Sequence, residues 1–212
     1  MQLVCFYIYL SILFSGSILG YAIYKYLDNK GKIINFLLSI TFLSETLAII
    51  MTKIHKRHTA VYHIYNIIEI IIISLYFMQA VEKANQRKYI LWIIVFWSAI
   101  GFGNMLIQPI TSLNSNMLII ECITIVPMAL YSLYKILLDD KIMNVTAYPH
   151  FWIWTCFLLY QCSTYFFWAF FDILILKSHY RNALIQAQII VNILAYAGIG
   201  LSFFLYPKMK AE

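Results

Sequence analysis

The sequence predicts an all-α integral membrane protein, with a single domain of seven transmembrane helices and no soluble domain. Of its 212 residues, 63% are hydrophobic and 11% are charged, whereas a soluble domain carries about 45–50% apolar and ~25% charged residues. The apolar residues fall into seven runs. Each run has the roughly 20 residues that a helix needs to cross a bilayer core about 30 Å thick.

The seven runs follow one another with short connections that are polar or charged. The first run is interpreted as a span and not as a signal peptide, because no Lys or Arg precedes it and its hydrophobicity continues to Leu27. Pro127 lies inside the fifth run and is expected to kink that helix. We expect the spans at about 3–25, 33–52, 60–81, 89–109, 116–138, 150–172 and 183–206.

The connections exclude several classes of protein. None approaches the about 50 residues of a small folded domain, and the chain lacks the GxxxxGK[ST] and GxGxxG motifs of nucleotide-binding folds. We therefore expect no kinase, ATPase or DNA-binding module, and no nucleic-acid partner. The net charge of +6 is interpreted as attraction to an anionic membrane surface.

The distribution of Lys and Arg predicts the orientation. Ten of the 15 basic residues fall in connections one, three and five, in the span ends beside them, and in the C-terminal tail. Because cytoplasmic loops are enriched in Lys and Arg, we expect the N-terminus outside and the C-terminus inside.

The third run carries the densest set of polar residues. His63, Asn66 and Glu69 are spaced three apart, so they lie within one arc of about 120° on a helix. Tyr62 and Tyr76 border that arc. Charged groups at membrane depth are costly and mark functional sites by default, so this face is predicted to line a site.

A second carboxyl group is expected at the same depth. At about 1.5 Å of rise per residue, Glu45 in the second run and Glu69 in the third lie at nearly one level. Consecutive helices joined by a short loop are usually neighbours. We therefore expect the two acids to face a shared space, where they would bind charge or couple protons.

Other polar residues favour the same, outer half of the membrane. They are expected in the later spans: Asn104, Glu121, Gln161 and Asn192. Together with the third run they predict a polar, aromatic-lined cavity that opens outward. The alternative is that Asn and Gln residues bridge helices as packing contacts only.

Cofactor and cysteine chemistry have little support in the sequence. Glu45, His63 and Glu69 offer a metal site as an alternative, although there are five His in all and no HExxH motif. Retinal binding is excluded because the last span has no Lys, and no other cofactor is expected. Cys5 and Cys122 fall near outer span ends, where a disulfide is geometrically conceivable; otherwise they are expected as small buried apolar residues.

The segments TFLSETLAII and AVYHIYNIIEIIIISLYF resemble a family of small uncharacterised bacterial inner-membrane proteins. Those proteins carry a Glu in span two and a YHIYxxIE-like run in span three. The matching positions here include Glu45, Tyr62, His63, Asn66 and Glu69. The resemblance implies a bacterial inner membrane and no particular activity.

Three hypotheses for function follow. The leading one is a multi-pass protein that binds a small polar or cationic solute in the outward-facing cavity, as a transporter or a sensor. A second is an intramembrane metal-dependent lipid hydrolase. A third is a non-catalytic accessory or pore subunit of a sensory or defence membrane complex. We lean towards a non-enzymatic role, with the lipid bilayer, a small ligand, and a second copy or another membrane protein as partners.

Overall fold

A computed structural model describes residues 2–55, 59–81, 83–112, 114–175 and 178–209. These residues form helices and turns, with no strand among them, so the predicted all-α fold is confirmed. Short helical turns, η1 (Val145–Ala147), η2 (Phe203–Leu205) and α8 (Tyr206–Met209), accompany the long helices. The long helices are α1 (Gln2–Ala22), α2 (Asn29–His55), α3 (Thr59–Met78), α4 (Ala84–Ile107), α5 (Ser115–Leu137), α6 (Pro149–Ile175) and α7 (Ser178–Ser202).

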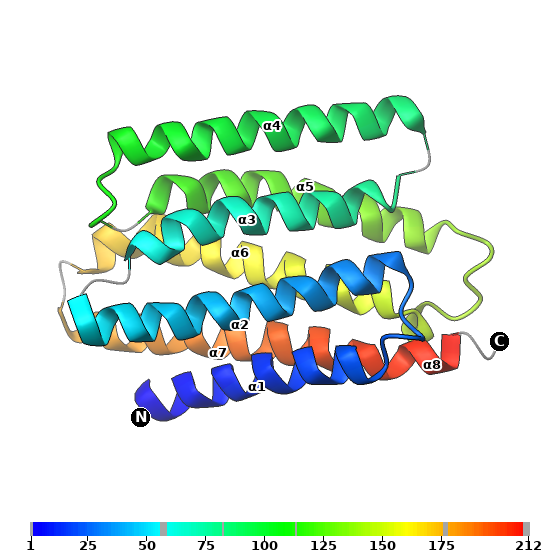
Figure 1. The fold of residues 1–212 in the computed structure, drawn as a ribbon, viewed down its shortest axis with the longest axis horizontal. Coiled ribbons are helices and arrows are strands. Elements are labelled where there is room, and N and C mark those ends of the chain that lie inside the picture. Colours follow the sequence, from blue (N-terminus) through cyan, green and yellow to red (C-terminus); the bar gives the residue numbers. More distant parts are fainter. Residues whose placement is uncertain (1, 56–58, 82, 113, 176–177, 210–212) are drawn as a thin grey trace.

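Six of the described helices, α1 to α5 and α7, are long and apolar enough to cross a membrane. The chain is therefore a multi-pass membrane protein. The seventh long helix, α6, has 27 residues. Successive helices alternate in direction, and α1 begins at the opposite end of the bundle from the point where α8 ends (Figure 1).

The ends of the helices differ from the expected spans by a few residues. The first span was expected to reach residue 25, but α1 ends at Ala22, and α2 begins at Asn29 rather than at 33. Asp28 explains the second difference, because its Oδ1 accepts the N–H of Gly31 at 2.7 Å and so caps α2. Hydropathy marks the bilayer core, whereas the cap determines where the helix begins.

His150, at the start of α6, holds Asp28 in place. His150 Nε2 donates to Asp28 Oδ2 at 2.9 Å. Burial raises the pKa of Asp28, but the hydrogen bonds from His150 and from the Gly31 N–H, together with the charge of Lys30, outweigh burial. The pKa of Asp28 therefore lies below its ordinary value of 3.8.

The helices form a ring with one helix outside it. Helix α1 packs on α2 and α7, α2 packs on α3, α3 on α5, α5 on α6, and α6 on α7. Helix α4 packs mainly on α3 and lies along one edge of the bundle (Figure 1). In α4 only 17% of the most apolar stretch is buried, against 61% in α3. Helix α3 is thus the central element, which is where the sequence concentrates its polar residues.

Small residues permit the closest approaches between helices. An added Cβ at Gly101 of α4 would lie 2.6 Å from Ile67 Cγ1 of α3, so glycine is needed for this contact.

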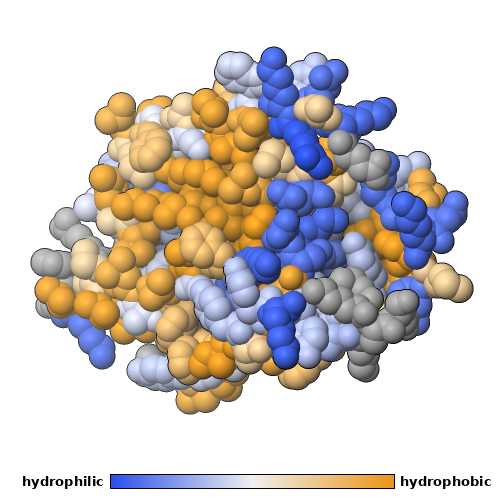
Figure 2. Space-filling view, turned by 45° about the vertical axis from the view of Figure 1, so that its right-hand side comes forward, coloured by the Kyte–Doolittle hydropathy of each residue, from blue (hydrophilic) through white to orange (hydrophobic). Residues whose placement is uncertain are grey.

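The exterior separates apolar from polar surface: Figure 2 shows apolar residues over the flank and hydrophilic residues gathered on the end that comes forward. This separation is that of a bundle with its flank in lipid and this end in water.

Candidate functional site

A cavity of about 200 Å³ lies among the helices of the ring. We call it the tyrosine cavity, because five tyrosines contribute to its wall. Every helix of the ring lines it, and the connection before α5 adds one residue. The lining residues are Tyr9, Glu45, Tyr62, Tyr65, Asn66, Glu69, Asn114, Leu118, Tyr160, Thr164, Gln188, Asn192 and Tyr196.

The two central acids both face this cavity. Glu45 lies ten residues before the end of α2, and Glu69 lies ten residues after the start of α3. At about 1.5 Å per residue, both are about 15 Å from the same end of the bundle. Their residues are 9% and 2% exposed. The structure thus places the two carboxyl groups at the same depth, and both line the tyrosine cavity.

Tyrosine hydroxyls hold the Glu45 carboxyl. Tyr62 donates to Glu45 Oε2 at 3.0 Å, and Tyr9 donates to Oε1 at 3.4 Å. The ring of Tyr9 lies 5.7 Å from that of Tyr196, which in turn lies 5.8 Å from that of Tyr160. The acid is therefore flanked by a continuous aromatic wall.

A similar arrangement surrounds Glu69. Tyr196 donates to Glu69 Oε1 at 3.5 Å, and Tyr65 lines the same cavity one turn before Glu69 on α3. The Tyr65 hydroxyl lies 2.8 Å from Thr41 Oγ1 of α2. Both acids thus accept hydrogen bonds from phenol groups of other helices, and the cavity is a polar space within an apolar bundle.

Two amide groups on the cavity have donors to spare. The Nδ2 atoms of Asn66 and Asn114 are buried and have no hydrogen-bond partner among the described residues. Their residues are 4% and 3% exposed. A buried donor without a partner costs about 1–3 kcal/mol, so these groups are placed to meet an acceptor inside the cavity.

Asn114 was missed by the sequence analysis because it lies in the connection before α5, which was treated only as a boundary. Asn104 Nδ2 donates to Asn114 Oδ1 at 2.9 Å, and Asn116 Nδ2 donates to Asn104 Oδ1 at 3.0 Å. Asn104 therefore acts behind the cavity wall, where it directs the free donor of Asn114 inward. The signal in the sequence was the closely spaced asparagines around this connection.

Glu121 and Gln161 also lie behind the wall. Glu121 is buried close to the carboxyl group of Glu69, and Gln161 Nε2 donates to Glu121 Oε1 at 3.3 Å. Cys122 Sγ donates to Gln161 Oε1 at 3.1 Å, so this chain of groups extends from the cavity into the α5–α6 interface.

On the α7 side, Asn192 lines the cavity as expected. Gln188 Nε2 bridges from α7 to α6, since it donates to Thr164 Oγ1 at 2.9 Å and to Asn192 Oδ1 at 3.2 Å. Of the predicted residues, the structure thus brings together Glu45, Tyr62, Asn66, Glu69 and Asn192 on one cavity.

His63 and Tyr76 share a helix face with Glu69 but lie at other depths. His63 Nε2 donates to the Ser112 carbonyl at 3.2 Å. The Tyr76 hydroxyl lies 2.9 Å from His150 Nδ1, and its ring stacks on Trp154 at 4.7 Å. Neither residue lines the tyrosine cavity, contrary to expectation. His63 is held at the connection before α5, and Tyr76 lies about 10 Å along α3 from Glu69.

The residues considered as metal ligands and as disulfide partners lie in the described part of the structure. Among the described residues, no three His, Cys, Asp or Glu side chains gather as ligands for one ion. The four cysteines, Cys5, Cys122, Cys156 and Cys162, are free thiols, so Cys5 and Cys122 are not bonded to each other.

Comparison with protein-family models, with curated proteins and with solved structures finds no match to this chain. The chemistry of the tyrosine cavity therefore indicates what it can bind. Its carboxyl groups accept hydrogen bonds or pair with a cation. The faces of its tyrosines attract cations. Its two free amide donors bind an oxygen acceptor.

Proposed function

We propose that the chain is a seven-span protein of the bacterial inner membrane, with its N-terminus outside, that binds a small amine in the tyrosine cavity. It acts either as a transporter of that amine or as a sensor that reports it to a partner. The distribution of Lys and Arg supports the orientation. In that orientation the tyrosine cavity lies in the outer half of the membrane.

The observation that carries the proposal is the composition of the cavity wall. Two buried acids, Glu45 and Glu69, stand among five tyrosines. An ammonium group there gains hydrogen bonds to the carboxyl groups, and it gains cation–π attraction worth about 0.5–2 kcal/mol per aromatic contact. A purely apolar solute would leave the free amide donors unpaired and would give the buried acids no counter-charge, which is costly.

The free donors refine the class of solute. Asn66 and Asn114 point N–H groups at the cavity that the described residues leave without partners. An amine that also carries a hydroxyl or carbonyl oxygen pairs with both sets of groups. At about 200 Å³ the cavity is smaller than the roughly 300–1,000 Å³ of drug-sized sites, so the solute is a small amino alcohol or a small zwitterion.

Ligand-dependent thermal stabilisation of the detergent-purified chain tests this function. Ethanolamine, choline and glycine serve as probes, with glycerol and acetate as uncharged and anionic comparisons. We expect at least one amine to raise the melting temperature. Glu45→Gln and Glu69→Gln should each abolish that rise, whereas Asp139→Asn, at an exposed acid outside the cavity, should keep it.

The proposal would be overturned if no amine stabilised the protein. It would also be overturned if an amine stabilised Glu45→Gln and Glu69→Gln as much as it stabilises the wild type. Uptake of the labelled amine into proteoliposomes then separates the two modes of action. Accumulation that Glu69→Gln abolishes supports transport. Binding without uptake supports a sensor.

A further inference from the structure

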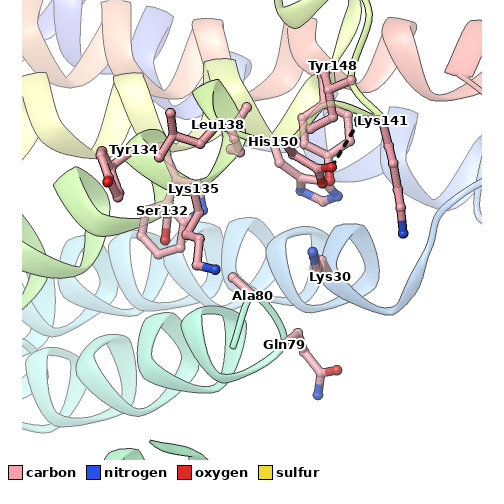
Figure 3. A pocket seen from close by; sticks show the side chains of 14 residues that line it. Lys30, Gln79, Ala80, Ser132, Tyr134, Lys135, Leu138, Lys141, Tyr148 and His150 are labelled. Carbon is pink, nitrogen blue, oxygen red and sulfur yellow. Dashed lines mark hydrogen bonds between the residues drawn. The ribbon is translucent and has the colours of Figure 1, made fainter. Parts of the chain in front are cut away.

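A second cavity, of about 590 Å³, lies at the other end of the bundle. We call it the lysine cavity, because Lys30, Lys135 and Lys141 line it. Lys30 comes from the start of α2, Lys135 from the end of α5, and Lys141 from the connection to α6. Figure 3 shows these side chains around the space between α2, α3 and α5.

The charge of the lysine cavity is positive. Among the described residues, none of the three lysines has an ion-pair partner within 4.0 Å. Of the described residues, one acid, Asp139, lines the cavity, and its Oδ1 accepts the backbone N–H of Lys141 at 3.1 Å. Nearby Asp28 is occupied by His150 and by the cap of α2. Three cations thus face a space to which the described part of the chain contributes a single carboxylate.

A buried hydroxyl points to a ligand independently of that charge. Ser132 of α5 lines the lysine cavity and is 1% exposed, yet its Oγ has no hydrogen-bond partner among the described residues. Helical Ser and Thr hydroxyls usually return to the i−4 carbonyl, as Thr124 does to Ile120 at 2.7 Å on the same helix. Ser132 therefore keeps a donor for something in the cavity.

A further donor lines the same space. Burial, with the negative charges of Asp28 and Asp139, raises the pKa of Tyr148 to about 12. Its phenol therefore keeps its proton at neutral pH and donates. The lysine cavity thus combines ammonium and hydroxyl donors with few acceptors, which suits a group that has several negative oxygens.

We propose that the lysine cavity binds a phosphate group, with Lys30, Lys135 and Lys141 as cationic partners and Ser132 as a hydroxyl donor. The volume exceeds that of bare phosphate and falls in the range of small-molecule sites. Leu138 and Ile142 add apolar wall for the remainder of the ligand. The group comes from a phospholipid headgroup or from a soluble phosphoester. This proposal does not depend on amine binding in the tyrosine cavity.

Affinity measurements on the full chain in a neutral detergent test this site. The probes are phosphatidylglycerol, phosphatidylcholine, glycerol 3-phosphate and inorganic phosphate, with bound lipid read by native mass spectrometry and soluble probes by calorimetry. We expect a phosphate-bearing anion to bind. Lys135→Gln with Lys141→Gln should weaken it about tenfold or more, the loss of one or two charge-assisted hydrogen bonds.

The matched control is Lys83→Gln with Lys88→Gln, which removes two charges from the same end of the bundle but outside the lysine cavity. It should change affinity less than twofold. Ser132→Ala should weaken binding severalfold and leave the unliganded melting temperature unchanged, because it removes a hydroxyl without a partner. Binding of phosphatidylglycerol alone supports a lipid source, and binding of a soluble probe supports a phosphoester. No binding by any probe, or equal losses in both double variants, would refute the site.

Discussion

Replacing His150 tests how the bundle is joined at the lysine-cavity end. This side chain is 2% exposed and connects three elements: Nε2 donates to Asp28 at 2.9 Å, and Nδ1 accepts from the Tyr76 hydroxyl at 2.9 Å. His150→Leu removes both bonds at similar side-chain volume, together with the longer contact of 3.5 Å between the Tyr206 hydroxyl and Nδ1. Tyr76 is 0% exposed, so its hydroxyl is left in an apolar interior with no water to replace the lost acceptor.

The expected cost follows from that burial. An unsatisfied buried hydroxyl costs about 1–3 kcal/mol, whereas Asp28 is 35% exposed and regains water. For a chain of this length, about 2–4 °C of melting temperature corresponds to each kcal/mol. We therefore expect His150→Leu to lower the melting temperature in detergent by roughly 2–12 °C.

A double-mutant cycle distinguishes this cause from simple loss of packing. Tyr76→Phe combined with His150→Leu removes both partners, so the double variant should be at least as stable as His150→Leu alone. Tyr134→Phe, an exposed tyrosine at the same end, should have no effect. Additive losses in the cycle would refute the reasoning.

Three further predictions follow from the structure. Gly101→Ala should destabilise the α3–α4 contact by about 1–3 kcal/mol in thermal unfolding, whereas Gly103→Ala, with nothing near its added Cβ, should be neutral or stabilising; equal effects would contradict the packing argument. Because the pKa of Asp28 is lowered, its ionised form stabilises the protein above about pH 4 and this contribution is lost as the pH falls through its folded pKa. Melting temperatures from pH 5 to pH 3 should therefore fall more steeply for the wild type than for Asp28→Asn, and parallel curves would argue against the assignment. Asn66→Leu removes an amide whose Nδ2 has no partner among the described residues, so it should not lower the unliganded melting temperature while amine binding weakens about tenfold; a large loss of stability would show a structural role instead.

The helical architecture was predictable because hydropathy reports directly on the bilayer. The seven long helices fall where the apolar runs predicted them, and the depth estimate for Glu45 and Glu69 follows from helical rise alone. Helix ends were less predictable. Asp28 begins α2 four residues earlier than expected because a cap depends on one hydrogen bond, to Gly31, and hydropathy does not report on such a bond.

The candidate site was predictable only in its acids and in one helix face. Periodicity identified the arc that holds Asn66 and Glu69, but an arc does not determine depth, so Tyr76 lies with His150 and not at the cavity. Asn114 was missed because its role depends on how a connection folds back over the bundle. The lysine cavity was missed because Lys30 and Lys135 were considered only as topological signals.

The most direct test of the central claim is the affinity of a small amine for the purified protein, with and without the Glu69 carboxyl. We predict saturable binding of at least one amine to the wild type, and a loss of affinity of at least about tenfold in Glu69→Gln, as expected when one charge-assisted hydrogen bond is removed. Asp139→Asn should bind like the wild type. Equal affinity in wild type and Glu69→Gln, or no saturable binding of any amine, would contradict it.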